Sequence, residues 1–67
     1  MKLQINGEVL EVPKSLQTIT DLLNHLELQN QTVIAEINDE IISNHKQDET
    51  AIKENDKIEL VRFVGGG

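Results

Sequence analysis

The spacing of apolar residues changes along this chain in a way that restricts the fold more than any other feature. Residues 1–6 alternate apolar and polar side chains, which is the period of a strand with one buried face. After residue 17 the apolar residues recur instead at the spacing of one helical face, at Ile19, Leu22, Leu23 and Leu26. Residues 32–37 and 57–64 are rich in β-branched or apolar side chains, which favours strands. One short amphipathic helix is therefore expected between two strand-forming regions.

The first strand-forming region carries the signal of a tight hairpin. Asn6-Gly7 can supply the positive φ angles of a two-residue type I′ turn. In that register Leu3 lies opposite Leu10, so that both strands bury the same face. Residues 1–13 are therefore predicted to form a β-hairpin.

A second, weaker hairpin is expected after the helix. Asn38-Asp39 resembles a tight turn that joins residues 32–37 to residues 40–42. Asp tolerates positive φ less well than Gly, so the signal is weaker than that of the first hairpin.

The segment from residue 43 to the last strand is polar. We expect Ala51 and Ile52 to be its only contacts with the core, and Asn55-Asp56 to form a turn.

The order strand, strand, helix, strand, strand, strand predicts an α+β fold. A right-handed crossover would lay the last strand, residues 57–64, beside the first strand. This is the β-grasp (ubiquitin-like) arrangement, a mixed sheet of about five strands covered on one face by a short helix. We expect residues 1–64 to form this domain and residues 65–67 to form a flexible C-terminal tail.

The composition argues against several classes of function. A 67-residue domain leaves little material for a walled, water-excluding cleft, which argues against an enzyme. The net charge of −6 would repel nucleic acid and anionic lipid. The longest apolar run, Val33-Ile34-Ala35, is too short for a membrane span, so we expect a cytoplasmic protein. The sequence holds no cysteine, so no thiol of this chain can carry sulfur or bind metal.

The most informative feature for function is the C-terminal end, Gly65-Gly66-Gly67. Three glycines have no side chain beyond hydrogen and extend by roughly 10 Å, so their carboxylate could enter a slot too narrow for other residues. A carboxylate becomes a good electrophile only after activation, for example by transfer of AMP from ATP. Sulfide or a persulfide could then attack the mixed anhydride and leave a thiocarboxylate on Gly67. Glycine ends are also often functionally silent, and the triplet alone does not decide between these alternatives.

Residues 54–67, Glu-Asn-Asp-Lys-Ile-Glu-Leu-Val-Arg-Phe-Val-Gly-Gly-Gly, resemble the closing segment of the ThiS family, the sulfur carriers of thiamin biosynthesis. The resemblance covers essentially the whole chain in length and element order, and its specific part is residues 63–67. It implies that an E1-like enzyme adenylates Gly67 with ATP and magnesium and that thiazole synthase accepts the sulfur, which a donor such as a cysteine desulfurase supplies. Gly65 and Gly66 would thread into the partner active sites, and this chain would bind no cofactor itself.

Two turns depart from the pattern expected of that family. Asn38-Asp39 and Asn55-Asp56 stand where Asn-Gly and Gly-Asp would be more usual. Both replacements are ordinary in turns, so they put the turn geometry in question rather than the activity.

Other functions remain open from the sequence. One is a carrier with the same chemistry for another pathway, such as the small subunit of molybdopterin synthase, although such carriers are typically longer and end in two glycines. Another is a ubiquitin-like modifier that is joined to lysines. A passive interaction module, with no ATP-dependent chemistry, is the last.

Phe63 and Val64 are possible partner contacts. Phe63 is the single aromatic residue of the chain, and strand alternation turns it to the face opposite that of Arg62 and Val64. It either joins the core, which we favour, or lies in an apolar patch that docks the adenylating enzyme.

Overall fold

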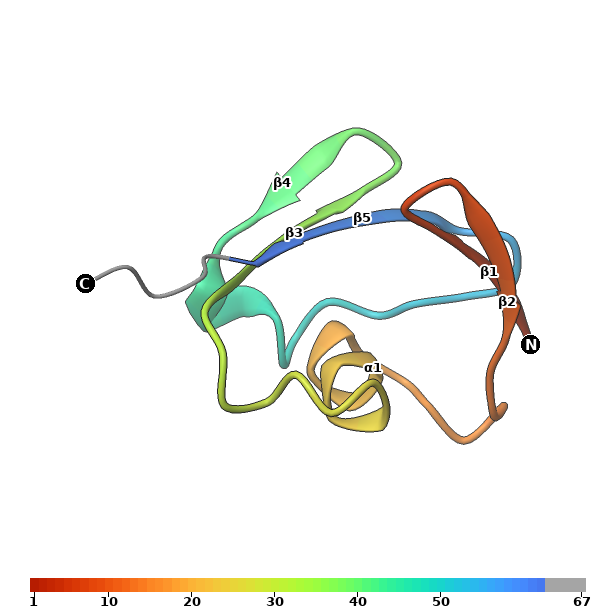
Figure 1. Ribbon diagram of the computed structural model, residues 1–67, viewed down its shortest axis with the longest axis horizontal. Coiled ribbons are helices and arrows are strands. Elements are labelled where there is room, and N and C mark those ends of the chain that lie inside the picture. Colours follow the sequence, from red (N-terminus) through yellow and green to blue (C-terminus); the bar gives the residue numbers. More distant parts are fainter. Residues whose placement is uncertain (63–67) are drawn as a thin grey trace.

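The structure describes residues 1–62 and places a five-stranded sheet against one α-helix (Figure 1). In this computed structural model the elements are β1 (Lys2–Ile5), β2 (Glu8–Glu11), α1 (Ile19–His25), β3 (Val33–Ile37), β4 (Glu40–Ile42), the 3-10 helix η1 (Asn44–Lys46) and β5 (Lys57–Arg62). Helix α1 covers one face of the sheet, and the other face carries no helix within residues 1–62 (Figure 1).

The last strand lies in the centre of the sheet. The strand order is β2-β1-β5-β3-β4, with β5 parallel to β1 and antiparallel to β3. The first and last strands are therefore neighbours, as the predicted crossover requires. The prediction of a mixed sheet of five strands, covered on one face by a short helix, is confirmed.

Both hairpin turns have the backbone angles that the sequence indicates. Asn6 and Gly7 have φ angles of 50° and 84°, and the register of β1 with β2 is the predicted one. Asn38 and Asp39 have φ angles of 49° and 73°. Two successive positive φ angles match the twist of the strands that the turn joins. The second turn reaches this geometry although it has Asp where Gly would be less strained.

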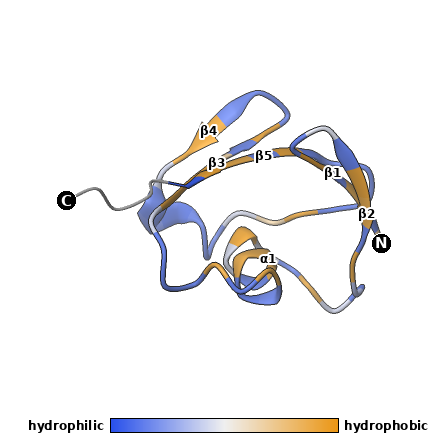
Figure 2. Ribbon diagram, viewed as in Figure 1, coloured by the Kyte–Doolittle hydropathy of each residue, from blue (hydrophilic) through white to orange (hydrophobic). Residues whose placement is uncertain are grey.

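The apolar stripe of α1 forms the centre of the core. Thr18 caps the helix: its Oγ1 accepts from the Asp21 N–H (3.2 Å), and Asp21 Oδ2 accepts from the Thr18 N–H (3.2 Å). The orange side of α1 in Figure 2 faces the sheet. The buried apolar residues are Leu3, Ile5, Val12, Ile19, Leu22, Leu23, Val33, Ala35, Ile52, Ile58 and Leu60.

One predicted core residue is exposed. Ile52 is buried, as expected, but Ala51 is exposed. Ala51 forms an isolated bridge with Thr18, which gives this segment extended geometry. Neighbouring side chains of an extended segment point to opposite sides, so only one of the two can face the core, and the larger side chain does.

The polar segment between β4 and β5 contains η1, which the sequence does not predict. No residue of η1 is buried, so its sequence has no apolar period to reveal it. The segment is tied down by polar contacts instead: Gln47 Nε2 donates to the Val33 carbonyl (3.0 Å), and Thr50 Oγ1 donates to the Lys46 carbonyl (2.7 Å). Within residues 1–62, neither helix has the length and apolar character needed to cross a membrane.

Candidate functional site

The residues predicted to carry the chemistry are the last ones of the chain. Phe63, Val64, Gly65, Gly66 and Gly67 lie outside the described residues, so their roles stay predictions, as does the boundary between domain and tail. The structure does describe the surface from which they continue, at the end of β5 (Figure 1). This surface is the candidate functional site.

Strand β3 holds the end of β5 on one side. Arg62 pairs with Val33, and Val61 pairs with Ile34. The Arg62 side chain is exposed, and its Nη1 lies 3.5 Å from Gln31 Oε1. The described chain therefore ends on the central strand of the sheet, beside the beginning of β3, and we call this end of β5 the exit of the chain.

The Asn6 side chain holds the same strand on its other side. Asn6 Oδ1 accepts from the Leu60 N–H (2.8 Å), and Asn6 Nδ2 donates to the Leu60 carbonyl (3.2 Å). The sequence predicts Asn6 only as a turn residue. A turn signal describes the local backbone and contains no information about a partner 54 positions away.

An apolar patch lies next to the exit of the chain, on the sheet face that α1 does not cover. Ile34 and Val61 are directly paired, and Ile41 lies on the adjacent strand β4. Ile41 is 69% exposed and Val61 52% exposed, whereas Ile34 is half-buried. We call these three residues the outer patch. Exposed apolar side chains that cluster on a small domain are typical of a protein-binding surface.

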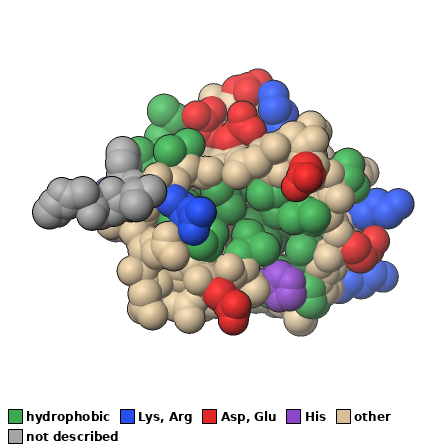
Figure 3. Space-filling view, in the orientation of Figure 1, with side chains coloured by type: hydrophobic (Ala, Val, Ile, Leu, Met, Phe, Trp, Pro, Cys, Tyr) green, Lys and Arg blue, Asp and Glu red, His purple; other side chains and the backbone are tan. Residues whose placement is uncertain are grey.

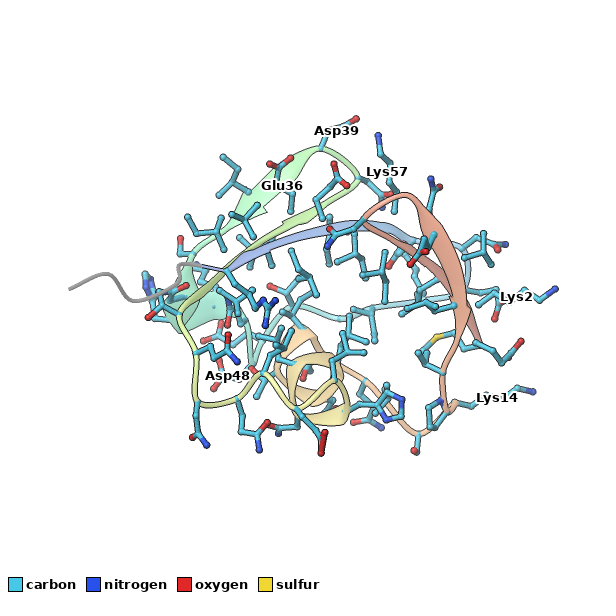
Figure 4. All side chains as sticks on the ribbon, in the orientation of Figure 1. Lys2, Lys14, Glu36, Asp39, Asp48 and Lys57 are labelled. Atoms are coloured by element: carbon cyan, nitrogen blue, oxygen red, sulfur yellow. The ribbon has the colours of Figure 1, made fainter. Side chains whose placement is uncertain are left out.

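Two carboxylates border the outer patch. Glu36 and Glu59 are directly opposite each other on β3 and β5, and Glu36 is also paired with Ile41. Like charges at opposed positions of an antiparallel pair are unfavourable. Figure 3 shows hydrophobic and acidic side chains side by side along the upper edge of the molecule, and Figure 4 labels Glu36 there.

Two lysines lie at the other end of the domain. Lys2 and Lys14 project from the end opposite the one at which the described chain stops (Figure 4). The N-terminal ammonium is at that end too and donates to Glu11 Oε2 (2.9 Å). This hydrogen bond and the positive charge of the ammonium hold the pKa of the Glu11 carboxyl below its ordinary value. The exit of the chain is thus bordered by the Glu36 and Glu59 carboxylates and by the Arg62 guanidinium, and Lys2 and Lys14 lie away from it.

One groove in the described part of the molecule is not lined by the last described residues of β5. It has a volume of about 510 Å³ and lies beside β4 and residues 50–53. Its buried acid, Asp56, accepts from the Lys53 N–H (2.8 Å) and from Asn38 Nδ2 (3.2 Å). Both carboxylate oxygens therefore have hydrogen-bond donors, and Asp56 is a structural group.

Metal binding has no support in the described part of the chain. Within residues 1–62, no group of three or more His, Cys, Asp or Glu side chains is placed to hold a metal ion. The described residues form a sheet whose central strand, β5, is the last described element.

The strand order, the single covering helix and the central last strand define a ubiquitin-like β-grasp domain. A family model described as the ThiS family matches residues 3–67. This chain belongs to the ThiS family.

Individual relatives agree with this assignment. The chain is 45% identical over 65 residues to the sulfur carrier protein ThiS of Bacillus subtilis (strain 168). The matched region covers 97% of this chain and 98% of that protein. It is 39% identical over 67 residues to a thiazole synthase of Paramagnetospirillum magneticum, of which it spans 20%. The crystal structure of a thiamine biosynthesis protein (ThiS) from Geobacter metallireducens superimposes with a TM-score of 0.82, at 33% identity and 100% coverage of both chains.

Proposed function

We propose that this chain is the sulfur carrier of thiamine biosynthesis and that the Gly67 carboxylate is the group that carries the sulfur. The observation that supports this most strongly is the family match over residues 3–67, which includes the glycine end. The similarity to the sulfur carrier of Bacillus subtilis extends over nearly the whole length of both chains.

The chemistry of a terminal carboxylate accounts for each step. A Gly67 oxygen attacks the α-phosphate of ATP, which forms the acyl adenylate and releases pyrophosphate. Sulfide then attacks the acyl carbon, the new C–S bond replaces the C–O bond to phosphate, and AMP leaves. The product is a thiocarboxylate, which is a sulfur nucleophile. This chain is the substrate in both steps and needs neither a cofactor nor a catalytic residue of its own.

The partners follow from the same chemistry. An E1-like adenylating enzyme uses ATP and magnesium, and a sulfur donor such as a cysteine desulfurase supplies the sulfur. Thiazole synthase is the proposed acceptor. The support for this acceptor is the thiazole synthase of Paramagnetospirillum magneticum, in which a segment similar to this chain makes up 20% of the protein. We place these reactions in the cytoplasm.

The outer patch is the proposed docking surface for the adenylating enzyme. Residues 63–67 can span at most about 17 Å from the end of β5. An enzyme that holds Gly67 must therefore sit close to Arg62, next to Ile34 and Val61. Exposed apolar side chains there would be buried on docking, and the predicted contacts Phe63 and Val64 continue from the same strand.

Intact-mass measurement tests the proposal. The purified chain is mixed with the adenylating enzyme of the same organism, ATP, magnesium and sulfide. Exchange of one oxygen for one sulfur at the C-terminus is the expected result, followed by return of the oxygen when thiazole synthase and its other substrates are added. Linkage to lysine amines would indicate a protein modifier instead, and no ATP-dependent change would indicate a passive binding module.

A further inference from the structure

The two neighbours of β5 hold it over different lengths. β3 pairs with β5 as far as Arg62, opposite Val33. β1 pairs with β5 only as far as Ile58, opposite Ile5. The part of β5 that leads to residues 63–67 therefore has a neighbouring strand on one side only.

Asn6 lies where β1 would have continued. Its backbone N–H donates to the Ile58 carbonyl (2.9 Å), which continues the ladder by one bond. Its side-chain amide then takes both backbone groups of Leu60, as acceptor for the N–H (2.8 Å) and donor to the carbonyl (3.2 Å). A primary amide has the same donor and acceptor as a peptide group, so the side chain replaces the missing strand residue.

Few residues can satisfy all the requirements at this position. The backbone of Asn6 has a φ of 50°, which Gly and Asn adopt more readily than other residues. Gly has no side chain to reach Leu60. An ionised Asp could accept from the Leu60 N–H but could not donate to its carbonyl.

We propose that Asn6 is a positioning residue for the activation of Gly67: it fixes the direction of the end of β5, from which residues 63–67 continue. This inference rests on the proposed function. By holding Leu60 from the side that β3 does not reach, Asn6 prevents the strand end from tilting before the adenylating enzyme binds it. The enzyme then binds a chain end that is already aligned with the docking surface, and less of the binding energy is spent on ordering it.

Asn38 provides a matched control. It too is a turn asparagine with positive φ, 49° against 50° for Asn6. It too holds β5 through both backbone and side chain, because its N–H donates to the Lys57 carbonyl (2.8 Å) and its Oδ1 accepts from the Lys57 N–H (3.1 Å). The difference is that Asn38 holds the beginning of the strand, whereas Asn6 holds the part near the exit.

The test compares Asn6→Gly with Asn38→Gly. Both substitutions keep a residue that accepts positive φ and remove only the amide side chain. Asn38→Gly should lower the urea midpoint at least as much as Asn6→Gly, because it also takes a donor from the buried Asp56. Steady-state adenylation is measured with the adenylating enzyme, ATP and each carrier, at a temperature at which both variants are folded.

We expect only Asn6→Gly to raise the KM for the carrier, by about tenfold, with kcat unchanged. Amide exchange at Leu60 should also accelerate in this variant and not in Asn38→Gly, since only Asn6→Gly removes the acceptor of that N–H. Equal KM values for wild type and both variants would overturn the inference. An equal rise in both variants would overturn it too, because the effect would then reflect β5 stability and not the direction of its exit.

A second variant keeps the test independent of folding. Asn6→Asp retains the acceptor for the Leu60 N–H and loses only the donor, so we expect a KM between those of wild type and Asn6→Gly. If Asn6→Asp showed faster amide exchange at Leu60 but kept the wild-type KM, the proposal would be contradicted. If the wild-type carrier itself were not adenylated, the proposed function would fall together with this inference. Adenylation of all forms with equal KM would overturn only the role of Asn6.

Discussion

The two ends of β5 are held in different ways. At its beginning, the carboxylate of Asp56 accepts from Asn38 Nδ2 and from the Lys53 N–H, and Asp56 is only 5% exposed. The Asp56 carbonyl also accepts from the Gln4 N–H. At its end, one asparagine side chain lies on one side and β3 on the other. The beginning of the strand is thus fixed by hydrogen bonds around one buried carboxylate, as a folding element would be. The end is held by β3 and by the Asn6 side chain and lies next to the outer patch, as expected for a surface that partners must reach.

The largest effect on stability should come from the beginning of the strand. Asp56→Ala removes the acceptor for the Lys53 N–H and for Asn38 Nδ2, and both groups are then left without a partner. We expect a loss of about 2 to 3 kcal/mol in the free energy of unfolding, measured by urea denaturation. Asp48→Ala, which removes an exposed carboxylate from the same segment, is the control and should change stability by less than about 0.5 kcal/mol. Equal effects of the two substitutions would show that these hydrogen bonds do not hold the strand.

The outer patch should affect partner binding more than stability. Val61→Thr keeps the β-branched shape and replaces one exposed methyl with a hydroxyl. We expect the KM for adenylation to rise by about threefold, because less apolar surface is buried on docking. Val9→Thr is the matched control, since Val9 is also an exposed strand valine, 69% exposed, on the edge strand β2. A KM that rose as much in Val9→Thr would remove the distinction between the exit and the rest of the sheet.

The smallest effect is expected at the turn of the second hairpin. Asp39 has a φ of 73°, where a side chain is strained. Asp39→Gly should raise the free energy of unfolding by about 0.5 kcal/mol, which urea denaturation can detect as a higher midpoint. The contact of Lys57 Nζ with Asp39 Oδ1 (3.5 Å) is lost, but both side chains are exposed and the pair contributes little. Adenylation should not change, and a destabilised variant would mean that this ion pair outweighs the strain.

Local signals in the sequence were sufficient to predict the five strands and α1, but not η1. Asn6-Gly7 predicted the first hairpin turn and its register, and the stripe around Leu22 predicted α1. The order of these elements then led to the sheet. Ala51 shows the limit of such signals, because a shift of one residue along an extended segment decides which side chain faces the core.

The candidate site was only partly predictable. The glycine end and its chemistry were predicted from the sequence and lie outside the described residues. The hydrogen bonds from Asn6 to Leu60 and from Asn38 to Asp56 join residues far apart in the chain. Each asparagine was recognised for the backbone that it permits, and nothing in a turn pattern indicates which distant backbone its side chain will reach.

The account as a whole depends on the terminal carboxylate, and removal of Gly67 tests it most directly. The shortened chain should have the urea midpoint of the full-length chain, because the described core ends before that residue. Incubated with the adenylating enzyme, ATP and sulfide, the full-length chain should exchange one oxygen for one sulfur in its intact mass, and the shortened chain should not change. A shortened chain that acquired sulfur as readily as the full-length one would contradict the account.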